Sequence, residues 1–207
     1  MIGFEIWRGD IARAAVDAVV NSANGSLYDR GGGTDLAIRM AGGRAIERDC
    51  QLLRATTLRS GLADGQAVAT TAGELPARWV IHTAAPVYSF AWDRSRTLAR
   101  CYRNCLLVAD RLRARTIAFP PLAAGSRGWP LFEAADIAVR ALIGARSAVD
   151  RVILVARDAA AEAAFAAAVG GDLGQWEELS NDDWLGPLKG ERGRQTAQAE
   201  FDPAAWA

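Results

Sequence analysis

Lysine is almost absent from this sequence. The chain has 24 basic side chains, and only one of them, Lys189, is a lysine. Chemistry that forms a covalent bond to a lysine amine is therefore almost excluded. The 24 basic residues are balanced by 24 acidic ones, so no overall positive field attracts nucleic acid or an anionic membrane. Any such partner would have to be recognised locally.

Histidine and cysteine are also scarce. The single histidine, His82, lies inside the apolar run RWVIHTAAP and is expected to be structural rather than catalytic. The three cysteines show no C-x-x-C spacing and do not form a disulfide framework. Cys101 and Cys105 could share a helix face and hold a metal, but no histidine lies near them in sequence. Cys50, Cys101 and Cys105 are therefore expected to be buried free thiols, without a metal.

Long apolar runs are missing as well. No run approaches the roughly 18 residues that cross a bilayer, and the first segment, MIGFEIWRGD, lacks the order of a secretory signal. We therefore expect a cytoplasmic protein with no membrane partner. With 207 residues, 51% of them hydrophobic, the chain can form one packed domain with an appendage.

Short runs of apolar and β-branched residues recur along the chain and predict about six strands. They are residues 4–7, 17–22, 66–71, 78–83, 116–122 and 151–156. Segments with a helical period lie between them, near residues 34–54, 93–114, 131–145 and 158–169. Strands that alternate with helices predict a layered α/β domain with a largely parallel central sheet.

The character of the sequence changes after about residue 170. Residues 171–207 are polar and aperiodic and contain glycine and proline, which predicts an irregular C-terminal extension rather than a second domain. Its tryptophans, Trp176, Trp184 and Trp206, are unusual, because disordered chains are poor in aromatic residues. Part of the extension is therefore expected to fold back on the domain or to hold a partner.

Three loops that follow expected strands carry the unusual chemistry. They are RGDIA (8–12), NSANGSLYDRGGGTD (21–35) and PLAAGSRGWP (121–130). In open α/β sheets, ligands bind beyond the carboxyl ends of the strands. Glycine turns from two strands could present backbone N–H groups to a diphosphate from opposite sides. The sequence has neither a Walker A motif nor G-x-G-x-x-G after the first strand.

In this order, several segments resemble the macrodomain family, specifically the MacroD type that hydrolyses esters of ADP-ribose. The segments are GDI (9–11), DAVVNSAN (17–24), GGGTDLAIRMAGG (31–43), LPARWVIHTAAP (75–86), CYRNCL (101–106), IAFPPLAAGSRGWP (117–130) and AADIAV (134–139). The resemblance implies a three-layer α/β/α macrodomain over residues 1–170, with a mixed, largely parallel sheet. It implies ADP-ribose as the ligand and no metal or redox cofactor. The extension lies outside the resemblance.

The resemblance also assigns residues to parts of the ligand. Asp10 is expected to accept a hydrogen bond from the adenine amino group, with the backbone of Ile11 beside it. Capping the turn before Ile11 is the alternative role of Asp10. Asn24 is expected to hold the distal ribose, and Gly32 and Gly33 would lie against this ribose and its phosphate.

The diphosphate and the reacting carbon are assigned in the same way. A turn of Gly125, Ser126, Arg127 and Gly128 is expected to wrap the diphosphate. Asp35 matches the catalytic acid of the family and would act with Asn24 at the distal ribose. Thr34 and Asp35 also begin an expected helix, where a hydroxyl cap and an acid are favoured for the helix alone. Asn21 is expected to be a structural amide that bonds local backbone.

Some positions depart from the family pattern. Asp29 and Arg30 precede three glycines instead of four, which changes the rim of the distal-ribose pocket. Arg127 stands where an aromatic residue is common, and Trp129 could supply an aromatic wall instead. Arg157 follows the last strand, where an aromatic residue often packs on adenine, and a guanidinium can also stack on a purine.

The residue types present favour ester hydrolysis. Cleavage at the anomeric carbon passes through an oxocarbenium-like transition state, which the Asp35 carboxylate can stabilise while it orients water. A carboxylic acid with a pKa near ~4 leaves unaided, whereas an arginine guanidine does not. We expect release of mono-ADP-ribose from Asp or Glu side chains of modified proteins, with O-acetyl-ADP-ribose as a small substrate.

Other functions stay open at this point. A non-catalytic reader of ADP-ribose would need the loops without the water chemistry. Nucleic acid is considered as a partner only where it carries ADP-ribose. Arg30 and Arg127 could then hold a neighbouring phosphate. Alternatively, these arginines are solvated loop charges. A scaffold would present its extension to a protein without binding the ligand. The macrodomain class with a lysine nucleophile is excluded unless Lys189 reaches the pocket.

Overall fold

The central sheet is mixed and largely parallel, as predicted. The computed structural model describes residues 2–28 and 32–170, and within them six strands form one sheet in the order β1-β6-β5-β2-β4-β3. The strands are β1 (Gly3–Arg8), β2 (Val16–Ala23), β3 (Ala67–Thr71), β4 (Ala77–Ala84), β5 (Thr116–Phe119) and β6 (Arg151–Ala156). Neighbouring strands are parallel except β3, which runs antiparallel to β4. All six predicted strands are confirmed.

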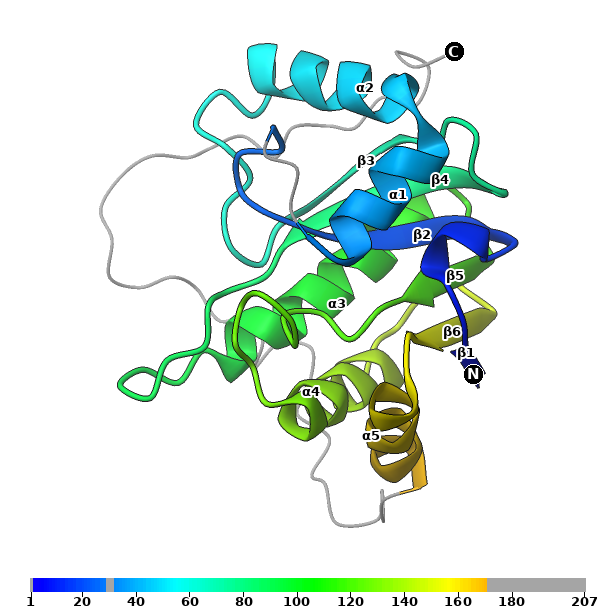
Figure 1. Ribbon diagram of the computed structural model, residues 1–207, viewed down its shortest axis with the longest axis vertical. Coiled ribbons are helices and arrows are strands. Elements are labelled where there is room, and N and C mark those ends of the chain that lie inside the picture. The colour runs from blue at the N-terminus through cyan, green and yellow to red at the C-terminus, as the bar shows by residue number, and fades with distance from the viewer. Residues whose placement is uncertain (1, 29–31, 171–207) are drawn as a thin grey trace.

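Helices cover both faces of this sheet (Figure 1). Helices α3 (Ser95–Arg111), α4 (Leu131–Ile143) and α5 (Ala159–Gly170) pack on one face, while the opposite face carries α1 (Thr34–Gly42), α2 (Arg44–Ala55) and the 3-10 helix η1 (Ile11–Arg13). Because side chains alternate along a strand, Val20 and Ile81 enter the first core while Val19 and Val80 enter the second. Central strands buried on both faces explain the continuous apolar runs of the sequence. The three-layer α/β/α prediction is confirmed.

One predicted helix is in fact two helices. The sequence predicts a helical segment near residues 34–54, but α1 ends at Gly42 and α2 begins at Arg44. Gly43 between them has a φ of +74°, in the left-handed region that favours glycine. A Cβ on Gly42 would lie 2.8 Å from the carbonyl oxygen of Ala72. The glycine pair therefore breaks the helix where the chain passes close to the segment after β3.

The topology brings the predicted loops to one edge of the sheet. Strands β1, β2, β4, β5 and β6 are parallel, so their carboxyl ends and the loops that follow them share that edge. The predicted insertion at Asp29 and Arg30 and the predicted extension, residues 171–207, lie outside the described residues. In the part of the chain that is described, none of the helices has the length and apolar character that crossing a membrane requires.

Candidate functional site

The loop after β1 is short and capped by its own acid. Asp10 is exposed and its carboxylate accepts a hydrogen bond from the backbone N–H of Ala12 at 3.0 Å, which caps η1. The next residue, Ile11, is buried in the core. The capping role of Asp10 is therefore present. A carboxylate has further lone pairs, so this cap is compatible with a second acceptor role for Asp10.

The loop after β2 is folded around Asn24. The side-chain oxygen of Asn24 accepts hydrogen bonds from the Ser26 hydroxyl at 2.8 Å and from the backbone N–H of Leu27 at 3.1 Å. Leu27 has a φ of +60° and its side chain is buried, so it anchors the loop in the core. The amide oxygen of Asn24 thus shapes its own loop at the end of β2.

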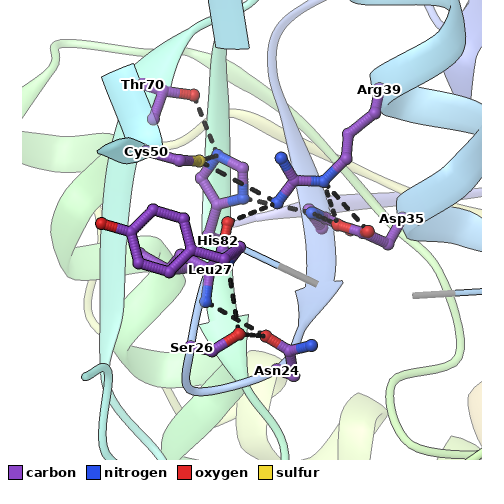
Figure 2. Close-up of polar contacts among 10 residues, drawn as sticks. Asn24, Ser26, Leu27, Asp35, Arg39, Cys50, Thr70 and His82 are labelled. Atoms are coloured by element: carbon purple, nitrogen blue, oxygen red, sulfur yellow. Dashed lines mark hydrogen bonds and ion pairs between the residues drawn. The ribbon is translucent and has the colours of Figure 1, made fainter. Parts of the chain in front are cut away.

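Asp35 lies in the first turn of α1, and its side chain points into the protein (Figure 2). It is only 3% exposed. The Asn21 amide donates to its Oδ1 at 2.6 Å, and Arg39 Nε lies 3.0 Å from both of its oxygens. The carboxylate is therefore held in one orientation from β2 and from the next turn of its own helix.

Arg39 is the buried partner of Asp35 that the sequence reasoning missed. It is buried and pairs with Asp35 four residues earlier, and its Nη2 donates to the carbonyl oxygen of Leu27 at 3.1 Å (Figure 2). Burial alone lowers the pKa of Arg39, but the charges and hydrogen bonds of Asp35 and Cys50 together raise it. The i,i+4 spacing of an acid and an arginine was the available signal. Arg39 joins the Asn24 loop to the Asp35 helix.

Asn21 does not bond local backbone, so that expectation is wrong. Its Nδ2 faces two side chains, Asp35 at 2.6 Å and Nδ1 of His82 at 3.1 Å. The partners come from α1 and β4, which are far from Asn21 in sequence. An amide that donates two hydrogen bonds can link these two groups.

The hydrogen bonds of His82 define its tautomer (Figure 2). The Asn21 amide has two hydrogens, and it donates one of them to Asp35. The other is left for Nδ1 of His82, which therefore accepts it. Nε2 lies 2.9 Å from the Thr70 hydroxyl, which itself donates to the Thr71 carbonyl oxygen at 3.0 Å. Nε2 therefore carries the hydrogen. Burial, aided by the charge of Arg39, lowers the pKa of His82 to about 3, which fits the predicted structural role.

We expect His82 to stay neutral in the folded protein at pH 5. The unfolded imidazole binds a proton below its ordinary pKa of 6.5, whereas the folded one does not until about pH 3. The contribution of His82 to the free energy of unfolding is thus fully present above pH 6.5. It falls by about 1.4 kcal/mol per pH unit between pH 6.5 and about pH 3. Nitrogen NMR on histidine-labelled protein measures the ring directly, since the chain has one histidine. A folded ring that titrates near pH 6.5 would contradict the assignment.

The cysteines are buried free thiols, as predicted. Cys50 lies beside His82 and Arg39. Its sulfur is 3.9 Å from Nε2 of His82 and 4.0 Å from Nη2 of Arg39. Burial raises the pKa of the Cys50 thiol to about 11. At neutral pH this sulfur is protonated and acts as a small apolar side chain with a weak donor.

The loop after β5 forms the second glycine turn. The N–H of Gly128 donates to the carbonyl of Gly125 at 3.0 Å, and Gly128 has a φ of +75°. The phenol of Tyr102, from α3, accepts from the backbone N–H of Leu122 at 2.9 Å and fixes the start of the loop. Gly125, Ser126 and Gly128 are exposed, and a Cβ on Gly125 would meet nothing within 4 Å. The turn is therefore anchored at its base and open at its tip.

Trp129 and Arg157 occupy different environments at this edge. Trp129 is 3% exposed, and its indole N–H donates to the carbonyl oxygen of Pro86 at 2.9 Å. It supports the glycine turn from below, and the ring of Tyr88 packs edge-on against it at 5.2 Å. Arg157 is exposed directly after β6. Tyr88 is half-buried, so it lies between the buried Trp129 and the surface.

Glycines also form the segment that leads into α1. Gly32 and Gly33 are exposed before α1, and a Cβ on either would meet nothing within 4 Å. Gly33 has a φ of +59°, which favours glycine there. Open glycine turns at two strand ends are typical of a site for an anionic ligand. With the buried carboxylate of Asp35, they make this a three-layer α/β/α domain suited to such a ligand at the carboxyl edge of its sheet.

The comparisons with known proteins name the family. The sequence model of the Macro domain matches residues 20–138. The chain is 51% identical over 170 residues to a macro domain-containing protein of Streptomyces coelicolor, covering 82% of this chain and 100% of that protein. It is 44% identical to an O-acetyl-ADP-ribose deacetylase of Salmonella newport over 66% of this chain and 75% of that protein. The chain belongs to the macro domain family.

Solved structures agree with this assignment. The Oceanobacillus iheyensis macrodomain with ADP superposes with a TM-score of 0.76 and 33% sequence identity, covering 80% of this chain and 89% of that chain. The Trypanosoma brucei macrodomain in complex with ADP-ribose superposes with a TM-score of 0.70 and 29% identity, covering 81% and 69%. The predicted family resemblance is confirmed.

Proposed function

We propose that this macrodomain binds ADP-ribose and hydrolyses esters at its distal ribose. The substrates would be mono-ADP-ribose on Asp or Glu side chains of proteins, and O-acetyl-ADP-ribose. Relatives named O-acetyl-ADP-ribose deacetylase and macrodomain structures with ADP or ADP-ribose support the ligand. The observation that carries the catalytic part is the carboxylate of Asp35, buried at the start of α1 and fixed by Arg39 and Asn21.

The loops at the carboxyl edge would each take one part of the ligand. Asp10 and the backbone of Ile11 would take the adenine, on which the exposed Arg157 could stack. Asn24 would hold the distal ribose. The open glycine turns would approach the phosphates from both sides, because a backbone without Cβ atoms allows close contact. These turns are Gly32 and Gly33 on one side and Gly125, Ser126, Arg127 and Gly128, supported by Trp129, on the other.

The chemistry follows from a fixed negative charge and a good leaving group. As the anomeric C–O bond breaks, positive charge develops on the ribose. The Asp35 carboxylate would stabilise that charge and orient the attacking water without reorganising, because it is already held in place. The bonding electrons leave with the carboxylate oxygen, and water supplies the new hydroxyl. No general acid is needed for this leaving group.

The environment of His82 supports an ester rather than an arginine linkage. A guanidine leaving group needs a proton donor. The imidazole nearest to Asp35 is neutral and buried, and its N–H faces Thr70. It therefore does not supply the proton that such a linkage would require.

Product release tests the proposal. We expect the protein to liberate ADP-ribose from O-acetyl-ADP-ribose and from a peptide carrying ADP-ribosyl-glutamate, and not from a matched peptide carrying ADP-ribosyl-arginine. Chromatography detects the product, and calorimetry measures ADP-ribose binding in parallel. Binding without release would leave a reader of ADP-ribose, and absence of binding would refute the ligand assignment.

A further inference from the structure

Two adjoining grooves lie beside the proposed ligand loops. Their volumes are about 580 and 260 Å³, and both are lined by the segment after β4, including Tyr88, Ser89 and Trp92. The larger groove reaches Thr97 in the first turn of α3, and the smaller reaches Trp129 and Glu133 at the start of α4. The roles proposed above leave these grooves without a ligand.

The segment after β4 exposes large aromatic side chains. Phe90 is 97% exposed and Trp92 is 75% exposed. Tyr88 packs edge-on against Phe90 at 5.1 Å and against Trp129 at 5.2 Å, so the exposed ring is joined to the core through aromatic contacts. A contiguous exposed apolar patch marks an interaction site more often than isolated surface residues do, and aromatic residues dominate binding energies at such sites.

This patch is tied to the proposed diphosphate turn. The backbone N–H of Tyr88 donates to the carbonyl oxygen of Arg127 at 2.8 Å, and the carbonyl of Pro86 accepts from the Trp129 indole. In Figure 1 the green loop after β4 projects from the body of the domain on the side where the β5–α4 loop lies. The patch follows β4 and the turn follows β5, so an acceptor joined to a ligand held by the turn would leave the domain at the edge of the sheet that carries this patch.

The charges around the grooves favour a polypeptide over a nucleic acid. The lining contains two acids, Asp93 and Glu133, and one arginine, Arg94. That arginine already pairs with Asp64 at 2.6 Å. Nucleic acid binding depends on cationic side chains that neutralise phosphates, and this lining does not supply an excess of them. The same acids suit a basic side chain beside an apolar one.

We infer that the grooves bind the acceptor polypeptide of an ADP-ribosylated protein, with an apolar side chain on Phe90 and Trp92 and a basic side chain near Asp93 and Glu133. The inference rests on the proposed function, because the polypeptide would be joined to the distal ribose of the ligand whose diphosphate the turn of Arg127 would hold. It makes the segment after β4 a determinant of substrate choice that does not touch the reacting bond.

The test compares substrates with and without a polypeptide. The double variant Phe90→Ser/Trp92→Ser is assayed on O-acetyl-ADP-ribose and on a peptide with ADP-ribosyl-glutamate flanked by leucine and lysine. We expect kcat/KM for the peptide to fall by about tenfold or more, and kcat/KM for O-acetyl-ADP-ribose to change by less than about twofold. The wild type should prefer this peptide to one flanked by serine and aspartate.

A matched control uses another exposed apolar residue. Leu107 on α3 is 50% exposed and lies about 18 Å along the helix from Ser95. Leu107→Ser should leave both substrates unchanged, and melting curves of all variants should match the wild type, because the altered side chains are exposed.

Several outcomes would overturn the inference. Equal loss on both substrates, equal use of both peptides, or preference for an ADP-ribosylated oligonucleotide would each do so. Faster peptide hydrolysis in the double variant would mean that the chain's own extension occupies the grooves. If the wild type fails on O-acetyl-ADP-ribose, the proposed function fails instead, and fluorescence anisotropy of the two unmodified peptides still tests the grooves.

Discussion

Asp35→Asn should reduce hydrolysis of O-acetyl-ADP-ribose by about 10²–10⁴-fold while ADP-ribose binding changes little. Asparagine keeps the shape of the side chain and can still accept from Asn21. It cannot carry the negative charge that would stabilise the developing positive charge on the ribose. The loss should therefore appear in kcat more than in KM, measured by initial rates, with calorimetry for binding.

Asparagine is chosen over alanine because Asp35 is buried, so truncation would add a cavity to the loss of the charge. Removing the carboxylate leaves the charge of Arg39 buried without a counterion, which costs about 3–5 kcal/mol. The assay temperature must therefore lie below the melting transition of the variant. Asp136→Asn is the matched control, because Asp136 forms an i,i+4 pair with Arg140 on α4 that is 42% and 39% exposed. Wild-type activity in Asp35→Asn would remove Asp35 from the mechanism.

Arg39→Met should be strongly destabilising, to about the same extent as Asp35→Asn. It leaves the Asp35 carboxylate buried and removes the hydrogen bond to the Leu27 carbonyl, so the free energy of unfolding should fall by about 3–5 kcal/mol. For a domain of this size the melting temperature should drop by roughly 6–20 °C. Thermal and urea unfolding measure the change.

Two further variants separate charge pairing from simple loss of packing. Asp35→Asn/Arg39→Met should lose less stability than the sum of its single variants, because no unpaired buried charge remains. Arg140→Met removes the exposed pair on α4 and should cost less than about 1 kcal/mol. Equal losses in Arg39→Met and Arg140→Met would contradict the buried-pair account.

Most of the fold could be predicted because it depends on local patterns. Runs such as residues 151–156 are buried on both faces of the sheet, so their apolar character is continuous in the sequence. The helix break at Gly42 and Gly43 was missed because the helical composition continues on both sides. What breaks it is a left-handed φ and a close approach to Ala72, and neither is visible in a periodicity.

The site was predictable in its loops and less so in its side-chain pairs. Parallel strands place their following loops at one edge, so the order of the motifs alone brings Asp10, Asn24 and the glycine turns to one edge. The partner of Asn21 depends on how β2, β4 and α1 pack together, so the amide bonds Asp35 and His82 instead of local backbone. Tertiary packing also buries the Asp35–Arg39 pair. The i,i+4 spacing alone does not distinguish this pair from a surface pair such as Asp136–Arg140.

The burial of the thiols makes the chain convenient for site-specific labelling. Burial raises the pKa of Cys50 and of Cys101 to about 11 and that of Cys105 well above its ordinary value. Maleimides react with exposed thiolates, so at neutral pH the native cysteines should remain unmodified. A cysteine introduced at Ser126 or Phe90, both exposed, would carry a single fluorophore or spin label without prior removal of native cysteines. Movement of either loop upon addition of ligand could then be followed in an otherwise unaltered protein.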